Sequence, residues 1–259
     1  MLKSIRKIFT ENMAYLLSLV VGFSLIEFFA RIVNQPYFPR ISGVFARLFD
    51  LFSEGDIVFD LFRSVQNLFL GFFISCTFGI LIGIICGRYT LVEQMLRPYI
   101  NALLTAPTVV FAPVYFAVFG TARWSIVALI VHYSVFYLIV NTTTAVRSVD
   151  REVLEMSKVF GATERQRMRL ILLPSATPLI FASLRVSMAR SVKGMINGEL
   201  LIAVVGLGAV SQNFARAFDA EGVFAVASLV VGVALLMGAV LGFVDGRVNS
   251  WVPDVRRKK

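Results

Sequence analysis

Charged and amide side chains interrupt one of the most apolar stretches of the chain, residues 179–204. With a rise of about 1.5 Å per residue, Arg190 lies roughly 18 Å from Pro178 along a helix, near the middle of a bilayer. A charge at that depth costs at least about 2.5 kcal/mol on insertion scales, so it should face a cavity or a partner. Because helical residues are about 100° apart, Arg190, Lys193 and Asn197 share one face, and Glu199 lies well round from it. These residues could bind a solute inside a membrane.

Two interpretations of this polar face stay open. In the first, Arg190, Lys193 and Asn197 line a translocation pathway and favour an anionic or strongly polar solute. In the second, they pair with Glu199 or with a second copy of the chain and hold a gate without touching solute. His132 is the only histidine, and no second His or Cys stands at metal-ligand spacing, which favours a satisfied or cavity-lining residue over a ligand. The candidate pathway residues are Arg190, Lys193, Asn197, Glu199 and His132.

The sequence lacks the common motifs of catalytic sites. No Gly-Lys-Ser/Thr is present to cradle nucleotide phosphates, and neither Gly-x-Ser-x-Gly nor His-Glu-x-x-His occurs. Cys76 and Cys86 are ten residues apart in one apolar segment, too far for a disulfide along a helix. We therefore expect no catalytic residue, metal or cofactor. If ATP powers this protein, another polypeptide hydrolyses it.

The composition predicts an all-α, polytopic membrane protein. Of 259 residues, 58% are hydrophobic and 24 are Phe, and the mean hydropathy is +0.79. A soluble domain of this size would need more polar residues on its surface. The net charge of +9 suits cytoplasmic loops and anionic lipid headgroups, so nucleic acid is not expected as a partner. About six spans of the required 20 or so residues are predicted: Met13–Val33, Ser64–Gly87, Tyr99–Gly120, Trp124–Val146, Leu179–Val204 and Val223–Asp245.

Basic residues predict the orientation and the domain limits. They gather at the N-terminus, at Arg88 and Arg97, in residues 148–174, and from Arg247 to the C-terminus, and the positive-inside rule places these segments in the cytoplasm. We expect a cytoplasmic segment at 1–12, a transmembrane domain at 13–250 that contains residues 148–174, and a basic cytoplasmic tail at 251–259. The N-terminus imitates a signal peptide, but its apolar run is long enough to span and no small-residue cleavage site follows, which favours a retained anchor.

Two spans carry features that predict their packing. Small residues repeat every four positions in the second span, at Gly71, Ser75, Gly79, Gly83 and Gly87. Such a seam lets a neighbouring helix approach closely. The third span contains Pro107 and Pro113, so we expect it to be kinked or interrupted.

Residues 148–174 form a charged island between apolar segments. Asp150 is a plausible N-cap for a helix whose apolar stripe is Val149, Val153, Met156 and Phe160. Gly161 follows as a C-terminal turn, and Thr163 with Gln166 forms a capping box that opens a second, basic helix. Pro174 is expected to end that helix. A water-exposed knob with one apolar face needs a partner.

The spacing of Glu155, Gly161, Ile171, Leu173 and Pro174 resembles the E-A-A-x3-G-x9-I-x-L-P loop of permease subunits of bacterial ABC importers. Met156 and Ser157 replace the family's usual two alanines. Pro107, Pro113, Phe119 and Gly120 further resemble the nitrate, sulfonate and taurine permeases of that family. The resemblance implies that the island is a coupling helix seated on a cytoplasmic ATPase. It assigns coupling to Glu155, Met156, Ser157, Phe160, Gly161, Ala162 and Arg165.

The resemblance also implies the assembly: two ATPase subunits, a second permease copy in a homodimer, and a periplasmic or lipid-anchored solute-binding protein, at a bacterial inner membrane. The substrate is expected to be a small anionic or polar nutrient of the nitrate, sulfonate, taurine or vitamin-precursor kind. Two alternatives remain: a secondary transporter or channel that needs no ATPase, and a membrane-embedded enzyme such as a lipid transferase, for which Asp150, Glu152 and Glu155 form the only acidic cluster.

Overall fold

The computed structural model describes residues 2–33, 35, 37–121, 123–202 and 204–251, except for the side chains of residues 2–12, 14–16, 19, 54 and 56. All regular structure in this part of the chain is helical, as predicted. The elements are α1 Leu2–Val33, α2 Ile41–Glu54, α3 Asp56–Arg88, α4 Thr90–Thr105, η1 Thr108–Phe111, α5 Ala112–Phe119, α6 Arg123–Arg147, α7 Arg151–Val159, α8 Glu164–Gln166, η2 Arg167–Leu172, α9 Leu173–Ile202, α10 Gly206–Arg216 and α11 Ala220–Val248.

Four helices among the described residues are long and apolar enough to cross a membrane, and a bent pair of helices brings the number to five if it is one span. The four are Ile57–Arg88, Arg123–Arg147, Glu164–Ile202 and Ala220–Val248. The remaining predicted span, Met13–Val33, lies in α1, where several side chains are outside the described residues. The predicted tail at 251–259 is also outside them, apart from Trp251.

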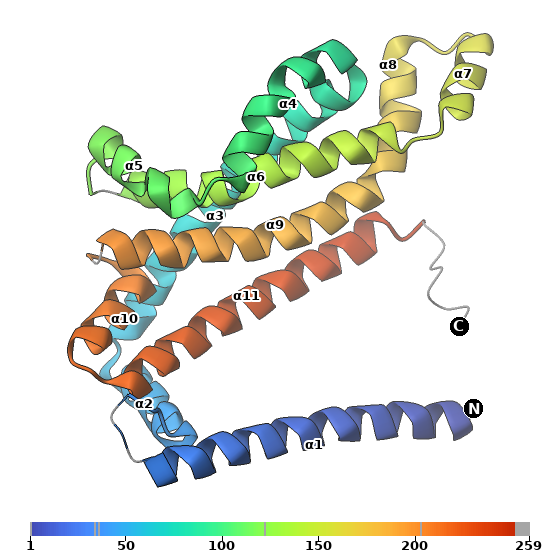
Figure 1. Ribbon diagram of the computed structural model, residues 1–259. Helices are drawn as coiled ribbons and strands as arrows, with labels where there is room; N and C mark the ends of the chain where they lie inside the picture. Colours follow the sequence, from blue (N-terminus) through green and yellow to red (C-terminus); the bar gives the residue numbers. More distant parts are fainter. Residues whose placement is uncertain (1, 34, 36, 122, 203, 252–259) are drawn as a thin grey trace.

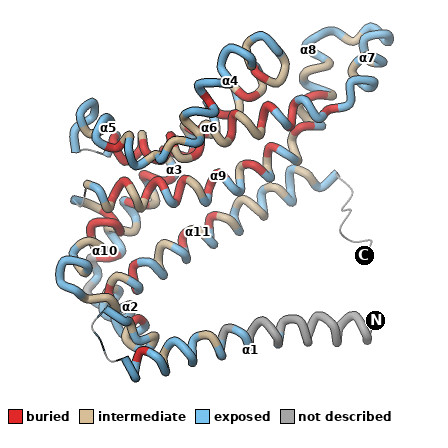
Figure 2. Tube along the Cα trace, viewed as in Figure 1, coloured by how far each residue is buried: buried red, intermediate tan, exposed pale blue. Residues whose placement is uncertain are grey.

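The core forms where α3, α6 and α9 pack together. A Cβ built on Gly71 would lie 2.5 Å from the Ile130 side chain, and one on Gly83 would lie 2.5 Å from Thr142. On the other side of α6, a Cβ on Gly194 would lie 2.8 Å from the Ile130 backbone. Only glycine permits these contacts, so the predicted small-residue seam is confirmed and α9 uses the same device. Figure 2 shows buried residues running along α6 and α9 and few on the described part of α1.

The predicted third span is interrupted, as its prolines indicated. Thr90–Thr105 and Thr108–Phe119 meet at 98°. Pro107 occupies the break, and Pro113 lies in the first turn of α5, where its missing N–H is tolerated. The Ser125 hydroxyl donates to the Gly120 carbonyl at 2.5 Å, so a carbonyl that the broken helix leaves free is satisfied inside the protein.

Pro174 does not end the second island helix, and that prediction is wrong. Helical structure runs on from Glu164 to Ile202. The segment just before the proline, Arg167–Leu172, is a π-helix. Its wider turn relieves the clash between the proline ring and the carbonyl four residues earlier, at Leu170, so the helix continues through Pro174.

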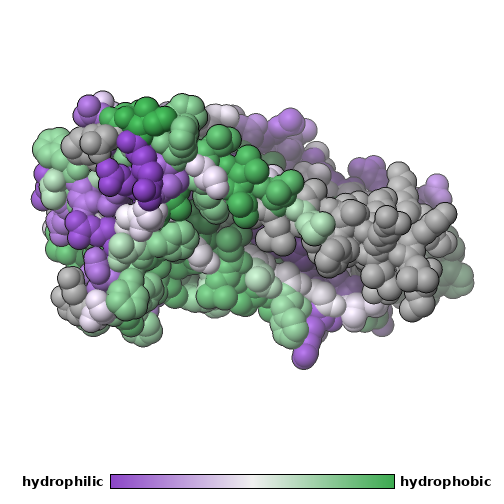
Figure 3. Space-filling view, turned by 90° about the horizontal axis from the view of Figure 1, so that it is seen from below, coloured by the Kyte–Doolittle hydropathy of each residue, from purple (hydrophilic) through white to green (hydrophobic). Residues whose placement is uncertain are grey.

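The long helices run roughly side by side between two ends of the molecule. In Figure 1, the α7–α8 hairpin, the start of α1 and the end of α11 lie at the same end, and α2, α5 and α10 lie at the other. Figure 3 shows hydrophobic residues over the middle of the face seen from below and hydrophilic residues gathered toward the end where α2 and α10 lie. This distribution suits helices that cross an apolar layer.

Candidate functional site

The hairpin formed by α7 and α8 has the local structure that its residues predict. The Asp150 side chain accepts the Glu152 N–H at 2.9 Å and caps α7. Gly161 follows with φ +80°, the left-handed conformation that favours glycine. The Thr163 and Gln166 side chains form both hydrogen bonds of a capping box. Defined caps at each turn make this hairpin a preformed element.

The outer face of the hairpin is apolar and open. Val159 and Phe160 are 86% and 85% exposed, and Met156 is exposed beside them. The predicted apolar stripe is only partly right, because Val149 is buried and packs with Leu172 in the bundle instead. Of the predicted coupling residues, Ser157 and Ala162 are half-buried; the others, Glu155, Met156, Phe160, Gly161 and Arg165, are exposed. An open apolar face on a rigid hairpin is suited to a protein partner.

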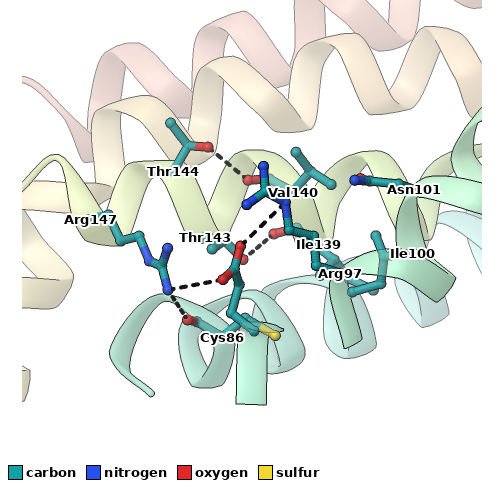
Figure 4. A pocket seen from close by; sticks show the side chains of 10 residues that line it. Cys86, Arg97, Ile100, Asn101, Ile139, Val140, Thr143, Thr144 and Arg147 are labelled. Carbon is teal, nitrogen blue, oxygen red and sulfur yellow. Dashed lines mark hydrogen bonds and ion pairs between the residues drawn. The ribbon is translucent and has the colours of Figure 1, made fainter. Parts of the chain in front are cut away.

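An ion pair ties the hairpin to the end of α3, and a separate set of contacts ties the end of α6 to the same end of α3. Glu164 pairs with Arg88, the last residue of α3, and with Arg167 of η2. At the end of α6, Arg147 donates to the Cys86 carbonyl at 3.2 Å and lies 3.6 Å from Glu93. Figure 4 shows this second link, in which Arg147 reaches from α6 across to the end of α3. A movement of the hairpin would therefore be transmitted to α3 through Arg88, and Arg147 joins α6 to that end of α3.

The pocket of Figure 4 lies beside this link. Its volume is about 270 Å³, and α3, α4 and α6 form its walls. Glu93 bridges Arg147 and Arg97, the latter at 3.8 Å. Thr143 and Thr144 donate to carbonyls of their own helix, to Ile139 at 2.7 Å and Val140 at 3.0 Å. Glu93 and the Cys86 carbonyl thus hold Arg147 at the wall of this pocket.

Three of the predicted pathway residues lie together on α9, alongside α6. The Arg190 guanidinium lies 4.4 Å from the centre of the Tyr137 ring. The Asn197 amide donates to the Tyr133 hydroxyl at 2.6 Å, and Lys193 between them is exposed. Neither tyrosine was among the predicted site residues. The four-residue spacing of Tyr133 and Tyr137 within a predicted span was the feature of the sequence that could have identified them as neighbours on one helix face. The face as a whole is cationic and hydrogen-bonding, so it suits an anion or a polar solute.

The structure does not bring Glu199 to this face. Glu199 is fully buried and accepts hydrogen bonds from the Ser64 hydroxyl at 2.8 Å and the Gly208 N–H at 3.1 Å. Ser64 in turn accepts the Leu207 N–H at 2.9 Å, and Asp60 accepts the Gly206 N–H at 3.0 Å. Three successive N–H groups at the start of α10 are thus capped by side chains of α3 and α9.

The Gly-Leu-Gly turn makes this capping cluster possible. Gly206 has φ +81°, and a Cβ on Gly208 would lie 2.4 Å from the Cβ of Glu199. Sequence reasoning missed Asp60 and Ser64, although their four-residue spacing places them on one helix face. The capping cluster, Asp60, Ser64 and Glu199, therefore holds α10 against α3 and α9.

His132 also lies apart from the polar face of α9. It is buried, with the Tyr115 hydroxyl 2.6 Å from Nδ1 and the Leu103 carbonyl 3.2 Å from Nε2. Its ring packs against those of Phe111 and Phe136. Both nitrogens face parts of the broken segment, so His132 ties that segment to α6. Within the described residues, no group of three or more His, Cys, Asp or Glu side chains is placed to hold a metal ion.

Comparisons with known proteins agree with this architecture. Residues 79–250 match the family described as the binding-protein-dependent transport system inner membrane component. The formylaminopyrimidine transport permease protein ThiX of Halalkalibacterium halodurans is 33% identical over 218 residues, which cover 84% of this chain and 85% of that protein. The nitrate import permease protein NrtB of Leptolyngbya laminosa is 26% identical over 207 residues, 79% of this chain and 72% of that protein.

Among solved structures, a chain of the MetNI methionine ABC transporter in an inward-facing conformation superposes with a TM-score of 0.60. The match covers 75% of this chain and 98% of that chain at 18% sequence identity. At that identity the match establishes a shared fold.

Proposed function

The chain belongs to the family of binding-protein-dependent transport system inner membrane components, and we propose that its α7–α8 hairpin couples a cytoplasmic ATPase to a solute pathway along α9. As a member of this family it is a multi-pass inner-membrane permease subunit of an ABC importer, and ATP is hydrolysed on a separate subunit. An external binding protein and an ATPase are its partners at family level. The proposal further names the coupling and pathway residues, a homodimer of permease chains, and an orientation with both termini in the cytoplasm.

The observation that carries the coupling role is the contrast between the two sides of the hairpin. Its inner side is anchored, because Leu154 packs against the cluster of Val149 and Leu172 and Glu164 pairs with Arg88. Its outer side presents Val159 and Phe160, each more than four-fifths exposed. A rigid base with an open apolar tip can transmit a push from a partner to the spans as a rigid-body movement. Glu155, Met156, Ser157, Gly161, Ala162 and Arg165 complete the proposed coupling surface.

The orientation follows from where the hairpin lies. The hairpin, the start of α1 and the end of α11 share one end of the molecule (Figure 1). ATP hydrolysis takes place in the cytoplasm, so a hairpin that docks on the ATPase places this end there. Both termini would then be cytoplasmic, with residues 13–250 as the membrane domain and 148–174 as its coupling loop, in agreement with the basic residues at that end.

A homodimer is the proposed assembly. Each chain offers one hairpin, and two cooperating ATPase subunits need two of them. A second copy of the chain supplies the second hairpin and the other half of a pathway between the two copies. Purification of the intact complex with one tagged and one untagged copy tests this. Recovery of a single copy beside a different permease would exclude the homodimer.

The polar face of α9 is the proposed pathway. Arg190, Lys193 and Asn197 would bind the solute, while Glu199 and His132 hold the elements around them. The cations favour an anionic or strongly polar nutrient. Proteins similar to this chain include permeases named for formylaminopyrimidine, nitrate and aliphatic sulfonates. This range of polar solutes fits a face that binds polar groups. The external binding protein would choose among such solutes.

The coupling role is tested by Phe160→Asp, with Leu170→Asp as the matched control. Both side chains are exposed, at 85% and 71%, but only Phe160 is in the proposed coupling surface. Placing a charge in an apolar interface should prevent ATPase docking, so Phe160→Asp should lose solute uptake and ATPase co-purification while remaining folded. Leu170→Asp should retain both. Normal uptake and ATPase binding in Phe160→Asp would exclude this coupling surface.

A further inference from the structure

A second cavity lies under the hairpin, between its inner side and the ends of α3 and α6. Its volume is about 360 Å³. Its lining contains four arginines and one carboxylate: Arg88, Arg147, Arg151, Arg167 and Glu164. Glu164 pairs with both Arg88 and Arg167, and Arg147 pairs with Glu93 outside the cavity. Even with both glutamates counted, four cations face two anions, so the cavity keeps an excess of positive charge. The coupling proposal uses the pair of Glu164 with Arg88 but assigns no ligand to this basic cavity.

One arginine of the basic cavity is held in an incomplete set of hydrogen bonds. The Arg167 side chain is only 19% exposed. Within the described part of the chain, its Nε is buried and has no hydrogen-bond partner. A buried donor without a partner is costly, and native proteins rarely leave one. An acceptor with several oxygens, placed between Arg88 and Arg167, would satisfy it.

The depth of the basic cavity indicates which acceptor can reach it. Arg88 and Arg147 are the last residues of α3 and α6, two helices that pass the length and hydropathy test for spans. The end of such a span lies at the level of the lipid headgroups, and basic pockets there bind anionic headgroups. Apolar side chains form the rest of the wall: Val146, Val149, Leu154, Met168 and Leu172. Val159 and Phe160, the proposed ATPase contacts, lie outside it.

We propose that this basic cavity binds the phosphate group of an anionic phospholipid of the cytoplasmic leaflet, with Arg88 and Arg167 as its principal ligands. The phosphate oxygens would accept from both guanidiniums and compete with Glu164 for them. The lipid would thus occupy the joint between the hairpin and α3. This site is additional to the coupling function. It rests on the proposed orientation but not on the ATPase contacts, so lipid binding can fail while coupling stands, and the reverse.

The test measures binding of dioctanoyl phosphatidylglycerol to the intact transporter complex in detergent, by native mass spectrometry. Dioctanoyl phosphatidylcholine and inorganic phosphate are the comparison probes. The wild-type complex should retain phosphatidylglycerol in preference to phosphatidylcholine. The double variant Arg88→Gln/Arg167→Gln should bind it about tenfold more weakly, which corresponds to about 1.4 kcal/mol. Glu164→Gln should bind it more tightly, because it removes the competing carboxylate.

Arg247→Gln is the matched control, because Arg247 lies in the last turn of α11 at the same end of the molecule but outside the basic cavity. It should bind lipid like the wild type. A loss in Glu164→Gln, or equal binding by the double variant and Arg247→Gln, would overturn the proposal. Displacement of the lipid by inorganic phosphate at equal concentration would assign the site to soluble phosphate instead. If the double variant loses the ATPase subunits but binds lipid like the wild type, the basic cavity would instead be assigned to the interface with the ATPase.

Discussion

Two sets of polar residues on α9 differ in how the protein holds them. Arg190, Lys193 and Asn197 lie on one face of the helix. Lys193 is exposed, and each of the other two contacts a single tyrosine of α6. Glu199, less than one turn further along, is fully buried and hydrogen-bonded to Ser64 and Gly208. A polar residue in an apolar helix can therefore fasten the fold or remain available to a ligand. The number and burial of its partners tell the two apart.

The largest loss of stability is expected on substitution of Glu199, the residue that fastens the fold. Glu199→Ala removes the acceptor of the Ser64 hydroxyl and the Gly208 N–H, and each polar group left unpaired in a buried site costs about 1 to 3 kcal/mol. We expect a marked fall in the thermal unfolding midpoint of the purified protein and loss of α10 packing. Glu199→Gln keeps an acceptor and should recover most of the stability.

Stability close to wild type in Glu199→Ala would show that α10 is held without the capping cluster. Uptake assays on Glu199→Gln separate the two roles of the residue. If Glu199 only caps α10, uptake by the folded Gln variant should stay near that of the wild type. A large loss of uptake in a stable Glu199→Gln protein would place the carboxylate in the pathway, where the sequence-based list of candidate residues includes it.

The polar face of α9 should respond in the opposite way. Lys193→Ala removes an exposed charge, so its effect on unfolding should be within about 0.5 kcal/mol. Uptake should fall about tenfold or more, because a hydrogen bond to a charged group contributes about 1.5 to 3 kcal/mol. Arg190→Ala should behave similarly and also lose its contact with Tyr137. Radiolabelled solute uptake into vesicles containing the assembled transporter measures both.

Arg185 provides the control for these variants. It is also a cation of α9, but it pairs with Asp245 of α11 at 2.5 Å. Arg185→Gln should weaken that pairing and leave solute selectivity unchanged. If Arg190→Ala and Lys193→Ala also leave uptake and selectivity unchanged in properly assembled protein, the face only braces the bundle, and the pathway proposal fails.

Local signals in the sequence predicted much of the fold. The hairpin caps depend on neighbouring residues, Asp150, Gly161 and the Thr163–Gln166 pair, and all were predicted correctly. The glycine seam of α3 was also predicted correctly, because a four-residue repeat of small residues in a membrane helix typically marks a face that packs closely against another helix. These features depend on residues a few positions apart, so the spacing of residue types is enough to recognise them.

Features that depend on distant segments could not be predicted. Ser64 and Glu199 are 135 residues apart, and no local pattern indicates that both cap the start of α10. The π-helix before Pro174 arises where the hairpin joins a long span, so the usual helix-ending role of proline was misleading there. Val149 follows the periodicity of the exposed stripe but lies just before α7 begins, where it packs with Leu172. Which side of a helix meets the bundle is decided by tertiary packing.

A smaller effect on uptake than at Lys193 is expected at Tyr133, which contacts a residue of the polar face but lies on α6. Tyr133→Phe removes the hydroxyl that accepts from the Asn197 amide at 2.6 Å and keeps the ring. The loss of one hydrogen bond should cost about 0.5 to 1.5 kcal/mol of unfolding free energy. If the tyrosine only orients Asn197 for solute, the apparent KM of uptake should rise about two- to tenfold while the maximum rate changes little. A stability loss as large as that of Glu199→Ala would mean that Asn197 is a structural residue, and the pathway would then rest on Arg190 and Lys193 alone.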